Sequence, residues 1–287
     1  MGPAEAGPAA VSVVSVVSVV SVGDSLRAAA ARLAAAGVDT SRLDAEVLLG
    51  AVLGVDRARL VVDRDRPLHE DAAARFDALL ARREAREPVA YIIGRRGFRR
   101  LELCVDRRVL IPRPETELLV ELGLELSEGA SVLDVGTGSG AVALALKDER
   151  PDLHVSGADV SADAVAVARA NAVRLGLEVT FVAADLMGGA SPDAVLANLP
   201  YVADGCELAP EITRYEPAGA LFGGPDGLDV IRRAVAAIAG PTVGLMALEI
   251  GPEQSPEVQR LLWEAGFSEV GIRRDLAGLE RVVVGTA

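Results

Sequence analysis

A glycine-rich loop is the first place in this chain where residue types and spacing suggest chemistry. The loop consists of Gly136, Thr137, Gly138, Ser139 and Gly140, and it joins an apolar run at 131–135 to a helix-like segment. Glycines let backbone amides approach a ligand without side-chain collision, and a helix N-terminus adds partial positive charge. The spacing from Gly136 to Ala141 also satisfies the dinucleotide-binding pattern Gly-x-Gly-x-x-Ala. The loop therefore predicts a ligand site without specifying the ligand.

Acidic residues end the next two predicted strands. Asp159 closes the second strand, where a carboxylate can accept both hydroxyls of a ribose; Asp185 and Leu186 end the third, where they can contact an adenine edge. Taken singly, the glycines can be a tight turn, Asp159 a helix cap and Asp185 a turn former. Together, at successive strand ends, they favour an adenosine-containing cofactor.

A turn after the fourth predicted strand reads Asn198, Leu199, Pro200, Tyr201. The Asn198 side-chain oxygen and the Leu199 backbone carbonyl are two acceptors that can hold both N–H bonds of a planar NH2 group. Pro200 has no N–H to compete, and Tyr201 offers a flat face to an amide or a base. Such a turn suits methylation of a carboxamide or an exocyclic base amine by positioning, without a strong base. The alternative is an ordinary Asn-Pro loop.

Hydrophobic spacing divides the chain into the parts that would position these residues. Residues 24–88 predict a helical domain with breaks at Gly37, Gly54 and Pro67, and with helix starts at Asp24 and at Thr40 or Ser41. Residues 89–112 predict a β-hairpin linker, with strands at 89–93 and 101–105 around an arginine-rich turn at 94–100. Residues 1–23, which include the Val/Ser-rich run at 11–22, predict a disordered low-complexity leader.

Residues 113–287 alternate between predicted strands and helices. Strands are expected at 131–135, 153–160, 178–185, 193–200, 242–250 and 281–285, and helices from 140, at 162–175, around 227–239 and at 256–265. This alternation is typical of an α/β fold with a doubly wound, mainly parallel sheet.

Composition limits the classes of partner, metal site and location that we expect for this protein. The net charge of −13 argues against a general nucleic-acid binder, although 15 arginines against 12 acidic residues in 24–100 suit that part to an acidic partner. Cys104 and Cys206 lie near no histidine, so we expect neither a metal site nor a disulfide. No apolar run reaches the roughly 18 to 20 residues of a membrane helix, and no Lys or Arg precedes the Val/Ser-rich run, as a secretory signal would require. A cytoplasmic location is therefore expected.

Six motifs resemble those of one known family, the glutamine-N5 methyltransferases of peptide-chain release factors (the HemK or PrmC family). They are EPVAYIIG at 87–94, LIPRPETE at 110–117, LDVGTGSGAVALAL at 133–146, NLPYV at 198–202, RYEP at 214–217 and LEIG at 248–251. The resemblance covers nearly everything from Asp24 onward. It implies a helical substrate-recognition domain at 24–88 and a catalytic domain at 113–287 with the Rossmann-like fold of S-adenosylmethionine-dependent methyltransferases.

The same resemblance implies roles for individual residues. Gly136 to Gly140 would hold the methionine end of S-adenosylmethionine, Asp159 its ribose, and Asp185 with Leu186 its adenine. Asn198 to Tyr201 would hold the glutamine of a Gly-Gly-Gln loop, with Asn198 also next to the cofactor. Arg113 would pair with the cofactor carboxylate or the substrate chain, or else precede a helix with Pro114 in its first turn. Glu249 is expected to be structural.

One position departs from the family pattern, which usually reads Asn-Pro-Pro-Tyr. Leu199 replaces the first proline, and Asn-Leu-Pro-Tyr also resembles rRNA adenine dimethyltransferases. An N6-adenine-type methyltransferase of RNA or DNA is therefore the alternative, and a non-methylating binding protein or dehydrogenase is a third hypothesis. LIPRPETE and RYEP favour glutamine.

Overall fold

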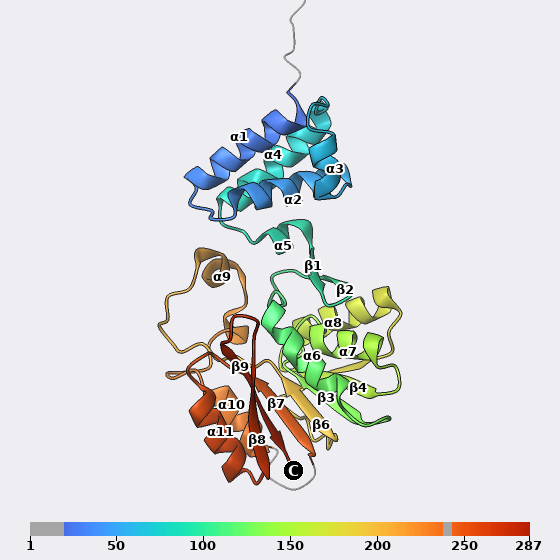
Figure 1. The fold of residues 1–287 in the computed structure, drawn as a ribbon, viewed down its shortest axis with the longest axis vertical. Helices are drawn as coiled ribbons and strands as arrows, with labels where there is room; N and C mark the ends of the chain where they lie inside the picture. The colour runs from blue at the N-terminus through green and yellow to red at the C-terminus, as the bar shows by residue number, and fades with distance from the viewer. Residues whose placement is uncertain (1–19, 238–242) are drawn as a thin grey trace, which may run out of the picture. The chain divides into compact units, whose positions relative to one another are not determined.

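The computed structural model describes residues 20–237 and 243–287, and the chain divides into two compact units between Ala85 and Arg86. The first unit is helical (Figure 1). Between residues 20 and 85 its helices are α1 (Val22–Ala35), α2 (Ser41–Leu53), α3 (Arg57–Val62) and α4 (Glu70–Glu84). The helical domain expected from the sequence is confirmed, with breaks between helices at Gly37, Gly54 and Pro67 as predicted.

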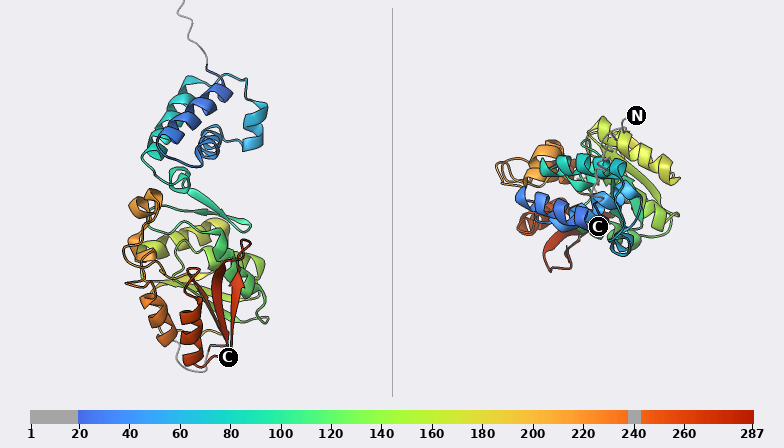
Figure 2. Two further views of the ribbon diagram at one scale, coloured as in Figure 1. Left: turned by 60° about the vertical axis from the view of Figure 1, so that its left-hand side comes forward. Right: turned by 90° about the horizontal axis from the view of Figure 1, so that it is seen from above.

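Side chains and glycines set the helix boundaries in this first unit. The Asp56 carboxylate accepts a hydrogen bond from Arg59 N at 2.7 Å and caps α3, and Gly54 ends α2 with a left-handed φ of 68°. Helices α1, α2 and α4 lie side by side (Figure 2) and bury leucines and a phenylalanine between them. Deep in this unit Arg83 Nε donates to Asp44 Oδ2 at 2.7 Å, so both charges are compensated where water is excluded.

The predicted boundary between the leader and the helical domain, at residues 23 and 24, is wrong. Residues 1–19 lie outside the described part of the chain, but Val22 and Gly23 belong to α1 rather than to a disordered segment. The helix starts before Asp24 because the Ser21 hydroxyl accepts from Asp24 N at 3.1 Å and so acts as the N-cap. Val22 is buried, and Gly23 N donates to Arg64 O at 2.8 Å.

The second unit begins with a short helix where a strand was predicted. Residues Val89–Ile93 form α5, because Tyr91 N and Ile92 N both donate to Pro88 O at 3.0 Å and Gly94 ends the turn with a φ of 73°. The hairpin strands are β1 (Arg95–Phe98) and β2 (Leu101–Cys104), so part of the predicted arginine-rich turn is itself a strand. The hairpin belongs to the second unit rather than standing apart as a linker.

A seven-stranded sheet in the order β5-β4-β3-β6-β7-β9-β8 forms the centre of the second unit, which confirms the α/β fold class. Its strands are β3 (Ser131–Val135), β4 (His154–Asp159), β5 (Thr180–Ala183), β6 (Ala194–Ala197), β7 (Leu245–Glu249), β8 (Glu269–Arg274) and β9 (Glu280–Thr286). Strands β3 to β7 are parallel, and β9 and β8 are antiparallel. Strand β8 was not predicted.

Helices cover both faces of this sheet (Figure 1). One layer contains α6 (Glu117–Leu124), α7 (Ala141–Glu149) and α8 (Ala162–Leu175); the other contains α10 (Asp229–Ala237) and α11 (Ser255–Glu264). The short elements η1 (Pro114–Thr116), α9 (Pro210–Tyr215) and η2 (Ala218–Ala220) complete the unit. Because the strand order reverses around β3, the carboxyl ends of β3, β4 and β6 border the crevice where such folds bind ligands.

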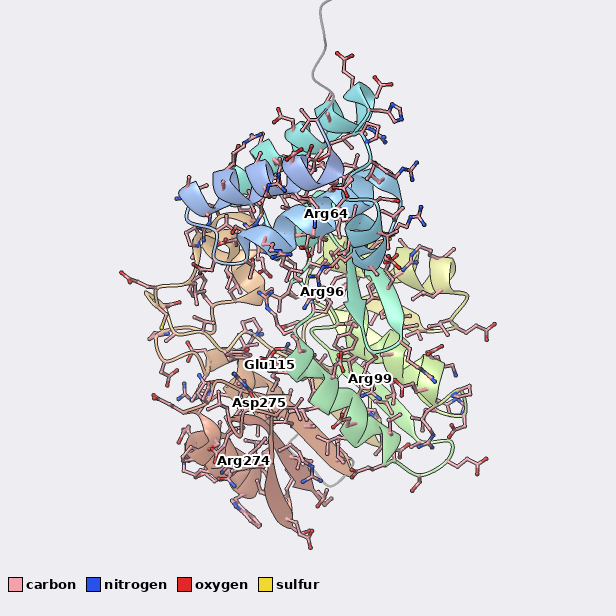
Figure 3. All side chains as sticks on the ribbon, turned by 45° about the horizontal axis from the view of Figure 1, so that its top comes forward. Arg64, Arg96, Arg99, Glu115, Arg274 and Asp275 are labelled. Carbon is pink, nitrogen blue, oxygen red and sulfur yellow. The ribbon has the colours of Figure 1, made fainter. Side chains whose placement is uncertain are left out.

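The arginines of the hairpin turn are engaged within their own unit. Arg99, labelled in Figure 3, donates to both carboxylate oxygens of Glu149 on α7 at 2.8 Å, and Arg100 pairs with Asp148 at 3.1 Å. Arg96 Nε donates to Pro112 O at 3.3 Å. These bonds attach the hairpin to α7 and to the segment at Pro112 within the second unit.

Candidate active site

A cavity of about 490 Å³ opens at the carboxyl ends of β3, β4 and β6. Its wall includes most of the predicted site residues: Gly136, Thr137, Gly138, Ser139, Asp159, Asp185, Leu186, Asn198, Leu199 and Pro200. Gly140, Arg113 and Tyr201 are absent from the wall. Segments far apart in the sequence thus meet around one space, as the strand-end argument predicted.

The glycine-rich loop has the backbone shape that only glycines adopt easily. Gly136, Gly138 and Gly140 have φ values of 73°, 55° and 82°, all in the left-handed region. A Cβ on Gly136 would lie 3.2 Å from Asn198 O, so the glycine lets this loop touch the Asn198 turn. Gly140 acts instead as the N-cap of α7, and a Cβ there would lie 2.9 Å from Leu144 Cδ1.

Asp134, at the end of β3, fixes the base of this loop. The Thr137 hydroxyl donates to Asp134 Oδ2 at 2.6 Å, and Ala143 N donates to the same oxygen at 3.2 Å. The carboxyl is 2% exposed, and burial raises its pKa to about 7, against the opposing effect of the Thr137 hydrogen bond. Asp134 was not predicted as a site residue.

Asp159 binds backbone amides with both of its oxygens. Gly138 N donates to Oδ2 and Ser161 N donates to Oδ1, each at 2.9 Å. A carboxylate has about four lone-pair sites, so each oxygen keeps one for a further donor. Asp159 therefore shapes the glycine loop and still has the capacity to accept a diol.

Asp185 and Leu186 lie at the rim of the cavity. Leu186 adopts a left-handed φ of 51°, and the Asp185 carboxylate pairs with Arg233, which also lines the cavity. Both partners are more than half exposed, so this ion pair contributes little to stability. A ligand edge that uses Asp185 would have to share the carboxylate with Arg233.

The Asn198 side chain is held by a residue that the sequence analysis did not single out. Asn198 Nδ2 donates to the hydroxyl of Thr116 at 3.0 Å, and Thr116 itself is buried and lines the cavity. With its NH2 group engaged, the amide has its oxygen left as the group for a ligand. Leu199 is also buried and packs against the glycine loop, since its Cδ2 lies 3.3 Å from the Cβ position of Gly136.

Tyr201 supports the turn from behind rather than lining the cavity. Its hydroxyl donates to Glu249 Oε1 at 3.3 Å, and its backbone oxygen accepts from Gln254 Nε2 at 2.9 Å. Burial, followed by the nearby Glu249 charge, raises the pKa of Tyr201 above its usual range, so the phenol keeps its proton. The ring is therefore a fixed support for the Asn198 turn.

Arg113 pairs with the buried Glu216 of the RYEP motif. Arg113 Nη2 lies 2.5 Å from Glu216 Oε1, and Ile111 N donates to Glu216 Oε2 at 3.1 Å. Pro114 occupies the first turn of η1, which agrees with the helix-start interpretation. The segments LIPRPETE and RYEP are thus joined by the bonds of Glu216 to Arg113 and Ile111. These bonds hold the segment that carries Thr116, the partner of Asn198.

Among the residues that sequence reasoning missed, Asn171 on α8 is the most central. Its side chain bonds Cys104 N at 2.8 Å, Cys104 O at 3.0 Å and Ser139 O at 2.9 Å. The available signal was only an asparagine in the middle of a predicted, largely apolar helix. The structure buries it fully, where a polar residue needs partners.

Fold and cavity together define the class of the second unit: a Rossmann-like sheet with a ligand cavity at the carboxyl ends of its strands. A family model described as the PrmC N-terminal domain matches residues 24–94, and one described as the Methyltransferase small domain matches residues 114–214. The release factor glutamine methyltransferase of Rhodospirillum rubrum is 40% identical over 99% of this chain and 87% of its own length. That of Cereibacter sphaeroides is 43% identical over 91% of this chain and 96% of its own length. The chain belongs to the release factor glutamine methyltransferase family.

A solved structure supports the fold alone. The hMettl16 catalytic domain, solved in complex with the MAT2A 3'UTR hairpin 6, has a TM-score of 0.54 and 14% identity, covering 76% of this chain and 82% of its own. No helix in residues 20–237 and 243–287 is long and apolar enough to cross a membrane.

Proposed function

We propose that this protein transfers a methyl group from S-adenosylmethionine to the side-chain amide nitrogen (N5) of the glutamine in the Gly-Gly-Gln loop of a peptide-chain release factor. The observation that carries the proposal is the hydrogen bond from Asn198 Nδ2 to Thr116 at the cavity wall. It leaves the Asn198 amide oxygen as an acceptor, and with the Leu199 backbone carbonyl this oxygen would form the pair of acceptors that a carboxamide NH2 requires. Family membership supports the same substrate.

The residues around the cavity fit S-adenosylmethionine. Gly136 and Gly138 would admit the methionine end, Asp159 has lone pairs left for the ribose hydroxyls, and Asp185 with Leu186 would border the adenine. The cofactor supplies an electrophilic methyl group. Arg113 has a different role in this proposal: it supports the wall through Glu216.

The protein's contribution to the reaction is orientation. Asn198 Oδ1 and the Leu199 carbonyl would each accept one N–H bond of the glutamine, which directs the nitrogen lone pair toward the methyl group. Positioning of this kind can supply several kcal/mol, up to about 7 to 11 in the best cases. The nitrogen gains a methyl group and loses one proton to solvent, and the proton leaves easily because the methylated amide is acidic until then.

The two units would divide the work of recognising the release factor. The helical unit would bind the protein away from the reacting glutamine, while the cavity binds the glutamine itself. The surplus of arginine in residues 24–100 falls in 86–100, which belong to the second unit, so it does not single out the helical unit. The expected location is the cytoplasm, where Cys104 and Cys206 would stay reduced.

Methyl transfer from labelled S-adenosylmethionine tests the proposal. The protein is incubated with a release factor, with the same factor carrying Ala in place of the loop glutamine, and with bulk RNA. Label is expected on the first substrate alone, and mass spectrometry of the loop peptide should place it on the glutamine. Label on RNA with none on the release factor would refute the proposal and favour the base-amine alternative.

A further inference from the structure

A second cavity lies within the helical unit, and the proposed reaction does not use it. It has a volume of about 320 Å³ and is lined by residues from α1, α2 and α3 and by Arg64. Its apolar lining consists of Leu26, Ala30, Leu60 and Val61. Leu60 is buried, whereas Val61 is 68% exposed, so the apolar lining continues out to the surface. We call this cavity the α1–α3 groove.

Backbone hydrogen bonds hold one end of the α1–α3 groove in shape. Gly23 N, in the first turn of α1, donates to Arg64 O at 2.8 Å, and Val22 N donates to Arg66 O at 2.9 Å. A Cβ on Gly23 would lie 3.1 Å from Arg64 O, so the glycine lets α1 approach the segment that follows α3. The groove is therefore built into the fold of the helical unit, and a partner that binds there need not order its main chain.

Four arginines surround the apolar lining. Arg27, Arg42, Arg57 and Arg64, the last labelled in Figure 3, line the groove and are each more than half exposed. Among the described residues of this lining, Glu46 supplies the one carboxylate. Arg42 donates to its Oε1 at 3.0 Å and Arg57 donates to its Oε2 at 2.6 Å. One negative charge is thus shared by two positive ones.

The other two arginines are paired only at the surface. Arg27 pairs with Asp24, and Arg64 lies 3.4 Å from Asp65, which is 91% exposed. Neither of these carboxylates lines the groove. Exposed ion pairs of this kind contribute little to stability, so the two guanidinium groups can exchange them at little cost for the carboxylates of a partner.

The charge and the apolar lining together define the kind of partner. Residues 24–85 carry ten arginines and eleven acidic residues, so the positive excess belongs to the groove and not to its unit as a whole. Phosphates of a nucleic acid could pair with the arginines, but they would leave the apolar lining in contact with water. A protein segment that carries both carboxylates and apolar side chains satisfies both parts of the surface.

We propose that the α1–α3 groove is the docking site for an acidic, amphipathic segment of the protein that carries the reacting glutamine. This inference rests on the proposed function. Apolar side chains of the segment fill the space beside Leu26, Leu60 and Val61, and its carboxylates pair with the surrounding arginines. Burial of the apolar groups supplies affinity, and the charges supply orientation and a faster association.

The first test measures methylation of a whole release factor by Arg64→Glu and by Val61→Asn. Arg64→Glu is expected to raise KM for the factor about 10-fold, and Val61→Asn about 5-fold, because each removes one kind of contact from the groove. The kcat at saturating release factor should change less than about 2-fold, since the active-site cavity lies in the other unit. Raising the ionic strength from about 0.05 M to about 0.5 M should increase the wild-type KM and increase that of Arg64→Glu less.

Each variant has a matched control within the same unit. Arg75→Glu reverses the charge of an exposed arginine on α4 that does not line the groove. Val62→Asn changes a valine that is 73% exposed and adjacent to Val61 but is not part of the lining. Both controls should keep the wild-type KM. Urea unfolding of all four variants checks that the helical unit remains folded.

The second test identifies the occupant by photo-crosslinking. The full chain, with Val61 replaced by benzoylphenylalanine, is irradiated with purified release factor, and the crosslinked peptide is identified by mass spectrometry. We expect a segment of the factor that is rich in Asp and Glu and also carries apolar residues. The same replacement at Arg75 is the control and should give no such crosslink. A crosslink to a second copy of this chain, or one that is lost on addition of bulk RNA, would overturn the inference.

The two proposals fail in different ways. If wild type methylates the release factor but Arg64→Glu and Val61→Asn keep its KM, or share a rise in KM with Arg75→Glu and Val62→Asn, this inference is wrong and the proposed function stands. If wild type itself transfers no methyl group to the glutamine, the proposed function fails instead.

Discussion

The two ends of the cavity are built by different means. At the proposed cofactor end, three glycines with left-handed backbone angles and one carboxylate bonded to two amides define the shape, so the shape comes mainly from the main chain. At the acceptor end, side chains from distant segments, Thr116, Tyr201 and Glu249, support one asparagine. A backbone site tolerates many side-chain changes around it, whereas a side-chain network depends on each member.

Because the two ends of the cavity are built separately, the rate of methyl transfer and the affinity for the cofactor should respond to different substitutions. Changes at the acceptor end should alter the rate of transfer and spare cofactor affinity, and changes at the cofactor end should do the reverse. Each of the following substitutions or conditions tests that separation.

Asn198→Ala should have the largest effect. It removes one of two acceptors that orient the nitrogen, and we expect the single-turnover rate to fall by about 100-fold to 1,000-fold, similar to the loss of a preorganised donor in other active sites. Calorimetric affinity for S-adenosylhomocysteine should stay within a few-fold of wild type. Turnover close to wild type would remove Asn198 from its proposed role.

Asp159→Ala should reverse this pattern. The variant loses charge-assisted hydrogen bonds to the ribose. The binding free energy of S-adenosylhomocysteine is therefore expected to weaken by about 1.5 to 3 kcal/mol, which is a roughly 10-fold to 150-fold loss of affinity. The rate at saturating cofactor should fall much less. The exposed Asp163→Ala, on the first turn of α8, is the control. Unchanged affinity in Asp159→Ala would contradict the assignment.

Gly136→Ala should affect both ends, because its Cβ would press on Asn198 O and Leu199 Cδ2. Gly176→Ala is the matched control, since Gly176 has a similar φ of 67° and open space at the Cβ position. Both pay the left-handed backbone cost of about 1 to 2 kcal/mol in free energy of unfolding. Only Gly136→Ala should also lower the affinity for S-adenosylhomocysteine and the rate of methyl transfer. Identical behaviour of the two variants would show that the loop and the turn are independent.

Stability should fall as pH rises from about 5 to 8, by about 1 kcal/mol or more. Burial raises the pKa of both Asp134 and Glu249 to about 7, so the folded protein holds protons that the unfolded chain releases near its ordinary carboxyl pKa. That stabilisation is complete below the unfolded pKa and is lost as pH passes through 7. Urea unfolding of wild type and Asp134→Asn should show a weaker decline in the variant. A decline of equal size would mean that Asp134 is not one of its sources.

Leu199→Pro should have the smallest effect. Proline keeps the carbonyl that is proposed to accept the substrate N–H and favours extended angles at Asn198, so the rate on a release factor should stay within a few-fold of wild type. The loss of packing against the glycine loop explains any modest decrease. A switch of methylation from the release factor to RNA, or the reverse, would show that Leu199 selects the substrate.

The same contrast explains what the sequence could predict. The glycine loop and the Asn198 turn are contiguous motifs, and the bounds of β3 and α8 agree with the predicted ones because regular patterning fixes both. The strand predicted at Val89–Ile93 was wrong because an apolar run of five residues fits a strand or a helical turn equally well. Pro88, which is the N-cap of α5, favours the helical turn. Thr116 lies in the LIPRPETE motif, but nothing in the sequence indicated its contact with Asn198, which lies 82 residues away. Arg113 pairs with Glu216 instead of lining the cavity.

The side chain of Asn171 also bears on how the protein folds. It joins β2 to the glycine loop through bonds that span 67 and 32 residues of chain. Closing such long loops is slow compared with forming a helix, so the cofactor loop can take its final shape only after α8 has docked between the two. Any fragment that keeps the Asn171 bonds must therefore include the hairpin and α8, and a nascent chain can form these bonds only once α8 has been synthesised.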